Sequence, residues 1–178
     1  GPDGHQRKWS IPNLSPNESQ RSRNYRETVM IFACINFERK TYFQFVEHTW
    51  KARDYAKVLK VMFDEMHNDD EDDEYVLYQD NASIHTVQLT MGVLEAEDIQ
   101  SAYAPARSPD LNPIENAWTQ LSRLVHAIEP SYDTKEELEE VILKSLNKLD
   151  QMYVANLCSS EPWRLLKTIF ANGEKIPY

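Results

Sequence analysis

The sequence predicts one α/β domain in which helices cover a mixed β-sheet. Three observations favour this fold class. Two runs rich in β-branched and aromatic residues lie close together in the first third of the chain, as in an antiparallel hairpin. Shorter apolar runs then alternate with stretches of helical periodicity, an order typical of a sheet packed against helices. The length of 178 residues suits a single domain with a well-buried core.

We expect the domain to span residues 29–178, after an extended arm or linker at residues 1–28. The arm holds three prolines and a stretch rich in Ser, Asn and Arg, and it shows no periodicity. Its basic side chains are candidates for a strip that faces DNA, and a solvated basic arm is the alternative. The five candidates are Arg7, Lys8, Arg21, Arg23 and Arg26.

The runs "VMIFACIN" (29–36) and "TYFQFVEH" (41–48) predict the two strands of the hairpin. Apolar side chains recur at steps of three and four from residue 52 to residue 66, which predicts an amphipathic helix. The short apolar run "YVLYQD" then predicts a strand that is buried on both faces. Asp80 lies at the carboxyl end of this strand.

The second half of the chain reads mainly as helices. Residues 84–96 are expected to form one helix and "IQSAYA" (99–104) another strand. A helix should then begin at Asn112 and Pro113, which are typical of an N-cap and a first turn.

The segment "SYDTKEELEEVILKSLNKLDQMYVANL" continues this helical part of the chain, with Asp133 or Thr134 as its cap. A final helix at about residues 160–171 should end near Asn172 and Gly173, a pair typical of a left-handed helix end.

Charge and cysteine content limit the classes of function. The net charge of −10 argues against a protein that wraps nucleic acid over its whole surface. The charge is uneven, since residues 1–40 carry +3 and the remainder −13. The acidic block "DDEDDE" (69–74) is usually a solvated loop and less often a partner or cation site. Cys34 and Cys158 are expected to be reduced, buried thiols rather than a zinc site or disulfide framework.

We expect no membrane association, because no apolar stretch approaches the eighteen or so residues of a membrane helix. The first residues show no pattern of a secretory signal, and an intracellular setting is therefore expected.

Two carboxylates are candidates for chemistry. Asp80 follows a strand at the sheet edge where α/β proteins bind ligands, and Glu115 lies in the first turn of a helix, beside its apolar stripe. Carboxylates brought close together favour a cation between them, and Mg²⁺ prefers such oxygen ligands. From the residues alone a turn role for Asp80 and a helix-dipole role for Glu115 remain the alternatives.

A resemblance to a known family changes this balance. "YQDNASIHT" (78–86), followed by "YAPARSPDLNPIENAW" (103–118), closely resembles the catalytic domain of the Tc/mariner superfamily of DNA transposases. Asp80 and Glu115 are separated by 34 residues, as in the branch whose third carboxylate is Glu. The opening "GPDGHQRKW", the two hairpin runs and the final "LLKTIFANGEKIPY" also resemble this family, so that the likeness covers nearly the whole chain.

The resemblance implies a ribonuclease H-like fold, with Asp80 and Glu115 as the second and third metal-binding acids. It implies Mg²⁺ or Mn²⁺ as the cofactor and DNA as the partner, in a nuclear protein that cuts one strand and joins a 3′-hydroxyl to target DNA. Four further motif residues are expected to support the two acids: Asn81, His85, Asp110 and Asn112.

In this family the first catalytic Asp lies on the central first strand, a few residues before the turn that "GPDG" resembles. Asp3 belongs to that turn, and we do not assign it the role of the first acid. We therefore expect the central strand to be missing from this chain, which would leave two unpaired edges inside the core. An upstream segment, a rearranged strand from residues 5–14, or a strand of a second protein could fill the place.

Two functions follow from this interpretation. The first is a domesticated transposase domain, catalytically inactive as this chain, that binds a protein partner or a second copy, with chromatin as the expected setting. The alternative is an active DNA transposase domain whose first Asp lies upstream. The acidic charge and the start at the "GPDG" turn favour the first, and the intact motifs around Asp80 and Glu115 favour the second.

Overall fold

The computed structural model describes residues 28–38, 41–66, 75–106, 108–128, 132–174 and 176. Residues 1–27 of the arm, with its five basic candidates and the segment 5–14, lie outside the described residues, as does the acidic block at 69–74. Among the helices of the described part, none is both long and apolar enough to cross a membrane.

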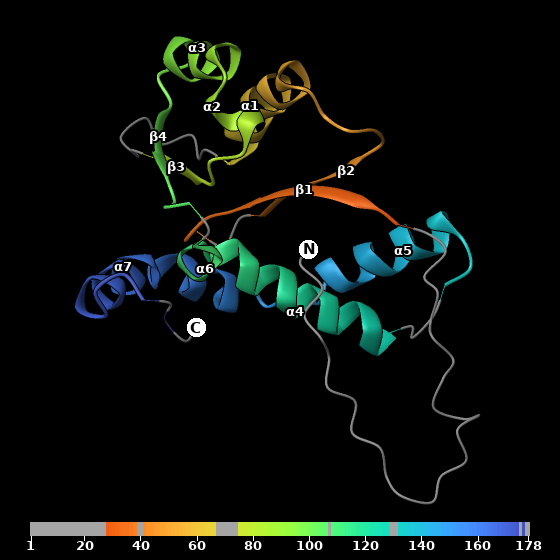
Figure 1. The fold of residues 1–178 in the computed structure, drawn as a ribbon. Helices are drawn as coiled ribbons and strands as arrows, with labels where there is room; N and C mark the ends of the chain where they lie inside the picture. Colours follow the sequence, from red (N-terminus) through yellow and green to blue (C-terminus); the bar gives the residue numbers. More distant parts are fainter. Residues whose placement is uncertain are drawn as a thin grey trace, which may run out of the picture.

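The predicted hairpin forms the middle layer of the molecule (Figure 1). Strand β1 (Met30–Ile35) pairs antiparallel with β2 (Thr41–Val46), with Ile31 opposite Phe45. Successive side chains of a strand point to opposite faces, and both faces of this hairpin are covered by helices. Phe32 packs into one hydrophobic cluster and Ile31 into the other, which explains why both runs are apolar almost throughout.

A layer of helices and strands lies above the hairpin in Figure 1. Strands β3 (Val76–Gln79) and β4 (Gln100–Tyr103) run parallel. Helices α1 (Ala52–Met66), α2 (Ser83–Thr86) and α3 (Gln88–Ala96) pack beside them. Their core with the hairpin is built around Leu59, Met62 and Leu94.

The single helix expected at residues 84–96 is wrong, because the structure breaks it into α2 and α3. Val87 between them has an extended backbone, with φ −69° and ψ 151°. The hydroxyl of Thr90 donates a hydrogen bond of 2.6 Å to the carbonyl of Ile84. In an unbroken helix this carbonyl would accept from the backbone four residues ahead, so the Thr90 side chain replaces that bond.

Below the hairpin lie the remaining helices. They are the 3₁₀ turn η1 (Pro109–Leu111), α4 (Pro113–Ile128), α5 (Lys135–Leu146), α6 (Gln151–Ser159) and α7 (Glu161–Phe170). A second hydrophobic cluster joins α4 and α5 to the lower face of the hairpin and includes Leu121, Ile142 and Phe43.

The ends of these helices follow the predicted signals. Thr134 caps α5, and its capping box is completed by Glu137. The helical segment that begins there is interrupted after α5, and Asp150 caps α6 by accepting a hydrogen bond of 2.8 Å from the backbone N–H of Met152. Residues 172 and 173 follow α7 with φ values of 54° and 83°, which confirms the left-handed ending.

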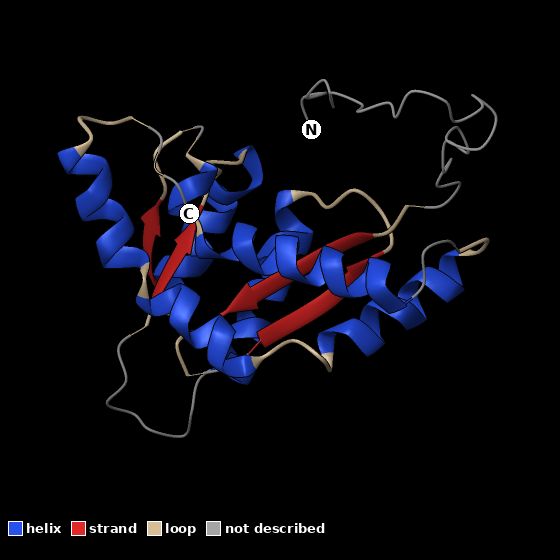
Figure 2. Cartoon of the chain, turned by 90° about the horizontal axis from the view of Figure 1, so that it is seen from below, coloured by secondary structure: helices blue, strands red, loops and turns tan. Residues whose placement is uncertain are grey.

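The sheet is divided into two halves. Strand β1 pairs with β2 and β3 with β4, and no strand of the described residues joins β1 to β3. Figure 2 shows the two pairs of strands lying apart. The predicted α/β fold with an open sheet centre is therefore confirmed for the part of the chain that the structure describes.

Candidate active site at an open sheet centre

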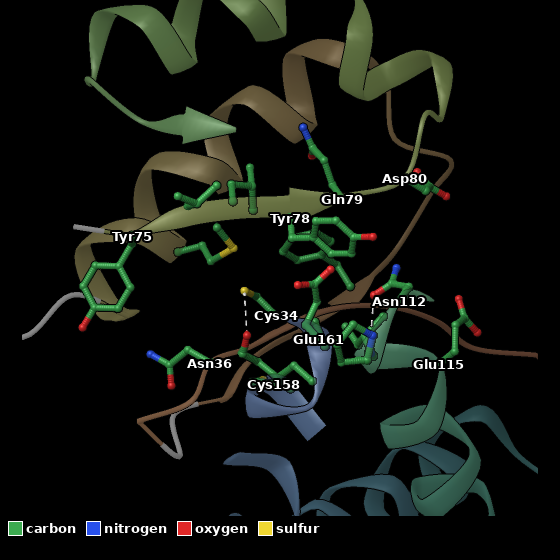
Figure 3. Close-up of a pocket in the computed structure, with 18 of the residues that line it drawn as sticks. Cys34, Asn36, Tyr75, Tyr78, Gln79, Asp80, Asn112, Glu115, Cys158 and Glu161 are labelled. Carbon is green, nitrogen blue, oxygen red and sulfur yellow. Dashed lines mark hydrogen bonds between the residues drawn. The ribbon is translucent and has the colours of Figure 1, made fainter. Parts of the chain in front are cut away.

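A cavity of about 560 Å³ lies between the two half-sheets, and we call it the slot. Residues 31–37 of the β1 side and residues 75–80 of the β3 side form its two long walls. Each wall consists of consecutive residues, as expected when the free edge of a strand faces the space. The slot therefore presents two strand edges where the sequence predicted a missing central strand (Figure 3).

One end of the slot is closed by an aromatic pair. Phe37, just after β1, stacks on Tyr75, just before β3, with ring centroids 6.3 Å apart and planes 26° apart. Because the end of one strand meets the start of the other, β1 and β3 run in opposite directions across the slot. A strand placed between them can thus pair antiparallel with β1 and parallel with β3, and it would then end beside Asp80.

Asp80 follows strand β3 directly, as predicted, and it lies at the other end of the slot. Its side chain is 63% exposed. Oδ1 accepts a hydrogen bond of 3.0 Å from the backbone N–H of Ala82 and lies 2.8 Å from Nδ1 of His85. The first of these contacts is the local turn bond typical of Asp, and the second is a side-chain contact that spacing alone did not predict.

Asn81 joins the ends of the two parallel strands. Its Nδ2 donates a hydrogen bond of 2.7 Å to the carbonyl of Ala104, and the N–H of Ala104 donates to the carbonyl of Gln79 at 2.8 Å. These two bonds extend the β3–β4 pairing past its last residues. Asn81 therefore fixes the backbone at the point where Asp80 leaves the strand.

Glu115 reaches the same end of the slot from α4 (Figure 3). It is exposed and lies in the first turn of the helix. Asn112 accepts a hydrogen bond of 3.3 Å through its Oδ1 from the backbone N–H of Ile114, which confirms its predicted role as the N-cap. Pro113 is buried and starts the helix, so the direction in which Glu115 leaves α4 is set by these neighbours.

A buried arginine that sequence analysis did not single out supports this helix start. Arg164 on α7 is fully buried. Its NH1 group donates hydrogen bonds of 2.8 Å to the carbonyl of Asp110 and 2.9 Å to Oδ1 of Asn116, and its Nε donates to Ser160. On an otherwise amphipathic helix, nothing in the spacing distinguishes this arginine from a solvated one.

Asp110 has a structural role within the same support. Its Oδ2 accepts a hydrogen bond of 3.1 Å from the backbone N–H of Ile176, near the end of the chain. Asp110 thus ties the turn before Glu115 to residues more than sixty positions ahead. The hydrogen-bond partner of the Asp110 side chain is a distant segment, and support of the two acids by Asp110 stays a prediction.

Thiols and other polar groups line the slot between its two ends. Cys34 and Cys158 are free cysteines, as predicted, and burial raises their pKa values to about 12 and about 11. Burial also raises the pKa of Glu161, against the opposing effect of Arg164. Oε1 of Glu161 and the hydroxyl of Tyr78 are buried and have no hydrogen-bond partner among the described residues. Such groups are expected to gain partners when the slot is filled.

The donor chemistry at the Asp80 end fits a hard divalent cation in part. Asp80 and Glu115 both line the slot and offer carboxylate oxygens, the ligands that Mg²⁺ and Mn²⁺ prefer. Within the described ranges no group of three or more metal-ligating side chains is close enough to hold an ion. The two acids are therefore an incomplete ligand set that one further carboxylate would extend.

Comparisons with known proteins agree with this geometry. The family model of the DDE superfamily endonucleases matches residues 4–139. The chain is 32% identical over 178 residues to the Tc3 transposase of Caenorhabditis elegans and covers 54% of that protein. It is 31% identical over 105 residues to the Tc1 transposase of the same organism, of which it covers 37%. The chain thus spans about half the length, or less, of these relatives.

Solved structures show the same fold. The catalytic domain of Mos1 mariner transposase matches with a TM-score of 0.66 at 19% identity, over 76% of this chain and 70% of that one. A Mos1 paired-end complex with the left transposon end matches with a TM-score of 0.79 at 18% identity, over 97% of this chain and 52% of that one. At these identities the likeness concerns the fold alone.

Proposed function

Because this chain belongs to the DDE superfamily of endonucleases, in its Tc/mariner branch, we propose that it carries the second and third acids of a metal-dependent DNA-cutting and strand-joining centre. The observation that carries the proposal is the position of Asp80 and Glu115. They come from two different elements, yet both line the slot at the end away from the aromatic pair. A strand that fills the slot parallel to β3 would bring a third acid to this end.

In this proposal the bound metal ions, Mg²⁺ or Mn²⁺, supply a polarised water or 3′-hydroxyl and stabilise the charge on the phosphate. Asp80 and Glu115 hold the ions, and Asn81 and Asn112 fix the backbone from which the two acids project. Support comes from Mos1 structures solved with Mn, with Mg and with a transposon end, which are relatives in fold. DNA as the partner and a nuclear location follow as parts of the same proposal.

Nicking of labelled duplex DNA tests this function. A protein in which this chain is preceded by a strand that carries the third acid should cut DNA with Mg²⁺ or Mn²⁺, and Asp80→Ala or Glu115→Ala should each reduce cutting to background. Glu95→Ala, which changes an exposed acid on α3, should cut like the wild type. Cutting that survives both site substitutions would exclude these two acids from the reaction.

A second function is favoured by the slot itself. Two strand edges that face each other suit a strand from a partner protein or from a second copy, which would make the domain an interaction module without catalysis. The expectation that the domain is domesticated and inactive stays a prediction. It would gain support if a protein with such an upstream strand folded normally and cut no DNA.

The two thiols in the slot distinguish the sources of the filling strand. If an upstream strand fills the slot, labelling of Cys34 and Cys158 by a small maleimide should be slower in a protein that has this strand than in this chain. Equal labelling rates would show that the upstream strand leaves the slot open. In that case, a partner protein that slows the maleimide labelling when it is added would be the donor of the filling strand.

A further inference from the structure

We propose that His85 is a positioning residue, which holds the Asp80 carboxylate in the orientation that binds the metal ion. The inference rests on the proposed function, because it assigns Asp80 to the metal. It goes beyond the expectation that His85 supports the two acids, because it names the contacts through which the histidine acts on Asp80.

The two carboxylate oxygens of Asp80 differ in their contacts. Oδ1 receives the N–H of Ala82 at 3.0 Å and lies 2.8 Å from Nδ1 of His85. Oδ2 has no hydrogen-bond donor among the described residues. One oxygen is therefore held by the protein, and the other is free to act as a ligand. A carboxylate held in this way loses less rotamer freedom when an ion binds.

The ring of His85 is itself held in place. It lies against the ring of Tyr55, with centroids 4.5 Å apart and planes 37° apart, and its side chain is only 17% exposed. Tyr55 is 2% exposed, and its hydroxyl donates to Oε1 of Gln79, the residue before Asp80. The support thus starts in the core and reaches the metal-binding carboxylate through the histidine ring.

The geometry also fixes where the ring carries a proton. Nδ1 of His85 has hydrogen-bond geometry toward the backbone carbonyl of Asp80, at 3.2 Å, and a carbonyl oxygen only accepts, so Nδ1 must be the donor. The same Nδ1 lies 2.8 Å from Oδ1 of Asp80, in an ion-pair contact with a second acceptor. Two acceptors at one ring nitrogen require the Nδ1–H form, and this assignment can be measured directly.

Two substitutions separate the donor from the ring. His85→Asn places an amide N–H near the position of Nδ1 but removes most of the ring. His85→Phe keeps a ring against Tyr55 but removes the donor. The matched control is His48→Phe. His48 is exposed, and its Nε2 lies 3.8 Å from the carboxylate of Asp54 on helix α1.

The experiment is a Mn²⁺ titration of the purified chain, followed by water-proton relaxation, with thermal unfolding to confirm that each variant is folded. Loss of an outer hydrogen bond to a metal ligand typically weakens metal binding by about 10–100-fold. We expect such a loss in His85→Phe, a change of less than about threefold in His85→Asn, and no change in His48→Phe. Long-range ¹H–¹⁵N correlations should show His85 of the wild type with its proton on Nδ1.

Three results would overturn the inference: wild-type affinity in His85→Phe, an equal loss in His85→Asn and His85→Phe, or a proton found only on Nε2. Equal losses would mean that packing of the ring, rather than its hydrogen bond, matters for the site. Asp80→Ala is included to test the underlying function separately. If Mn²⁺ bound Asp80→Ala as tightly as the wild type, the metal assignment would fail and this inference with it.

Discussion

The two acids of the site are supported in opposite ways. Asp80 is held by partners close in sequence, since Ala82 and His85 lie within five residues of it. Glu115 depends on residues far along the chain, because Arg164 and Ile176 hold the turn and the helix from which it projects. One half of the site is thus a local structure at a strand end, and the other is a product of the assembled helical layer.

This difference predicts that the two halves of the site respond differently to destabilising substitutions. Local hydrogen bonds re-form as soon as β3 and β4 pair, so the Asp80 half should tolerate a weakened C-terminal region. The Glu115 half should fail with the contacts of α7, even though α7 contributes no acid to the ligand set. The comparison can be tested by substitutions that weaken one half at a time.

The largest effect is expected for Arg164→Met. The substitution keeps the apolar stem but leaves the carbonyl of Asp110 and the side chain of Asn116 without their buried donor. Unfolding in urea should show a loss of about 3 kcal/mol, because each buried group left unpaired costs about 1–3 kcal/mol. Hydrogen exchange should rise at residues 109–116 and change little at residues 79–82.

Lys57→Met is the control for this prediction, since it removes an exposed cation from helix α1. Its stability should stay within about 0.5 kcal/mol of the wild type. Exchange that rises equally at both halves of the site in Arg164→Met would contradict the division between them.

A smaller effect is expected for Asp110→Ala. This change removes only the acceptor of the Ile176 N–H, a partly buried bond to a charged group. The expected cost is about 1–2 kcal/mol, which would lower the melting temperature by about 2–8 °C for a domain of this size. Asp110→Asn keeps an acceptor oxygen and should recover most of the loss. No recovery would indicate that the charge itself, rather than this bond, stabilises the turn.

Asn81→Ala tests the local half of the site. It removes the bond to Ala104 that joins the ends of β3 and β4, at an expected cost of about 1 kcal/mol. Exchange should rise at residues 79–82 and 104 and remain unchanged at residues 109–116, the reverse of the pattern for Arg164→Met. Circular dichroism melts and exchange mass spectrometry of the two variants side by side would show whether the supports are independent.

The smallest effect is expected for Glu161→Gln, which tests the slot between the two halves. Burial raises the pKa of Glu161, so its charged form is costlier in the folded protein than in the unfolded one. The contribution of Glu161 to folding stability is therefore fully present below the ordinary pKa of a glutamate. It is lost as the pH rises through the raised pKa of the folded protein. Glu161→Gln should equal the wild type near about pH 4 and be slightly more stable at neutral pH. The same difference at both pH values would argue against a desolvated Glu161.

Much of the fold could be predicted because its signals are local. The periodicity of residues 52–66 gave α1 with its observed bounds, and the Thr134 cap and the end at residues 172–173 follow from side-chain chemistry within one turn. The break at Val87 was missed because it depends on which partner takes a single carbonyl. Periodicity reports which face of a helix is apolar and carries no information on that competition.

The same reasoning explains what was missed at the site. Asp80 and Glu115 could be proposed from motif and spacing, and their common position at the slot agrees with that proposal. The role of Arg164 could not be predicted, because the burial of an arginine depends on which groups of the other helices pack around it. Support of the acids by His85 was expected from the motif, but its contact with Asp80 was not, because the short helix α2 that holds His85 sets the direction of the ring and was predicted with the wrong bounds.

The free edges of β1 and β3 that line the slot face inward, and this orientation affects how the domain associates with other chains. An edge that faces solvent can add strands without limit, which is the route to aggregates. The edges of β1 and β3 face each other, and the stack of Phe37 on Tyr75 closes one end of the space between them. A strand that enters pairs on both sides at once and leaves no new edge at that place. Binding through the slot should therefore saturate at one strand per domain, and a titration should show a defined stoichiometry rather than growth with concentration.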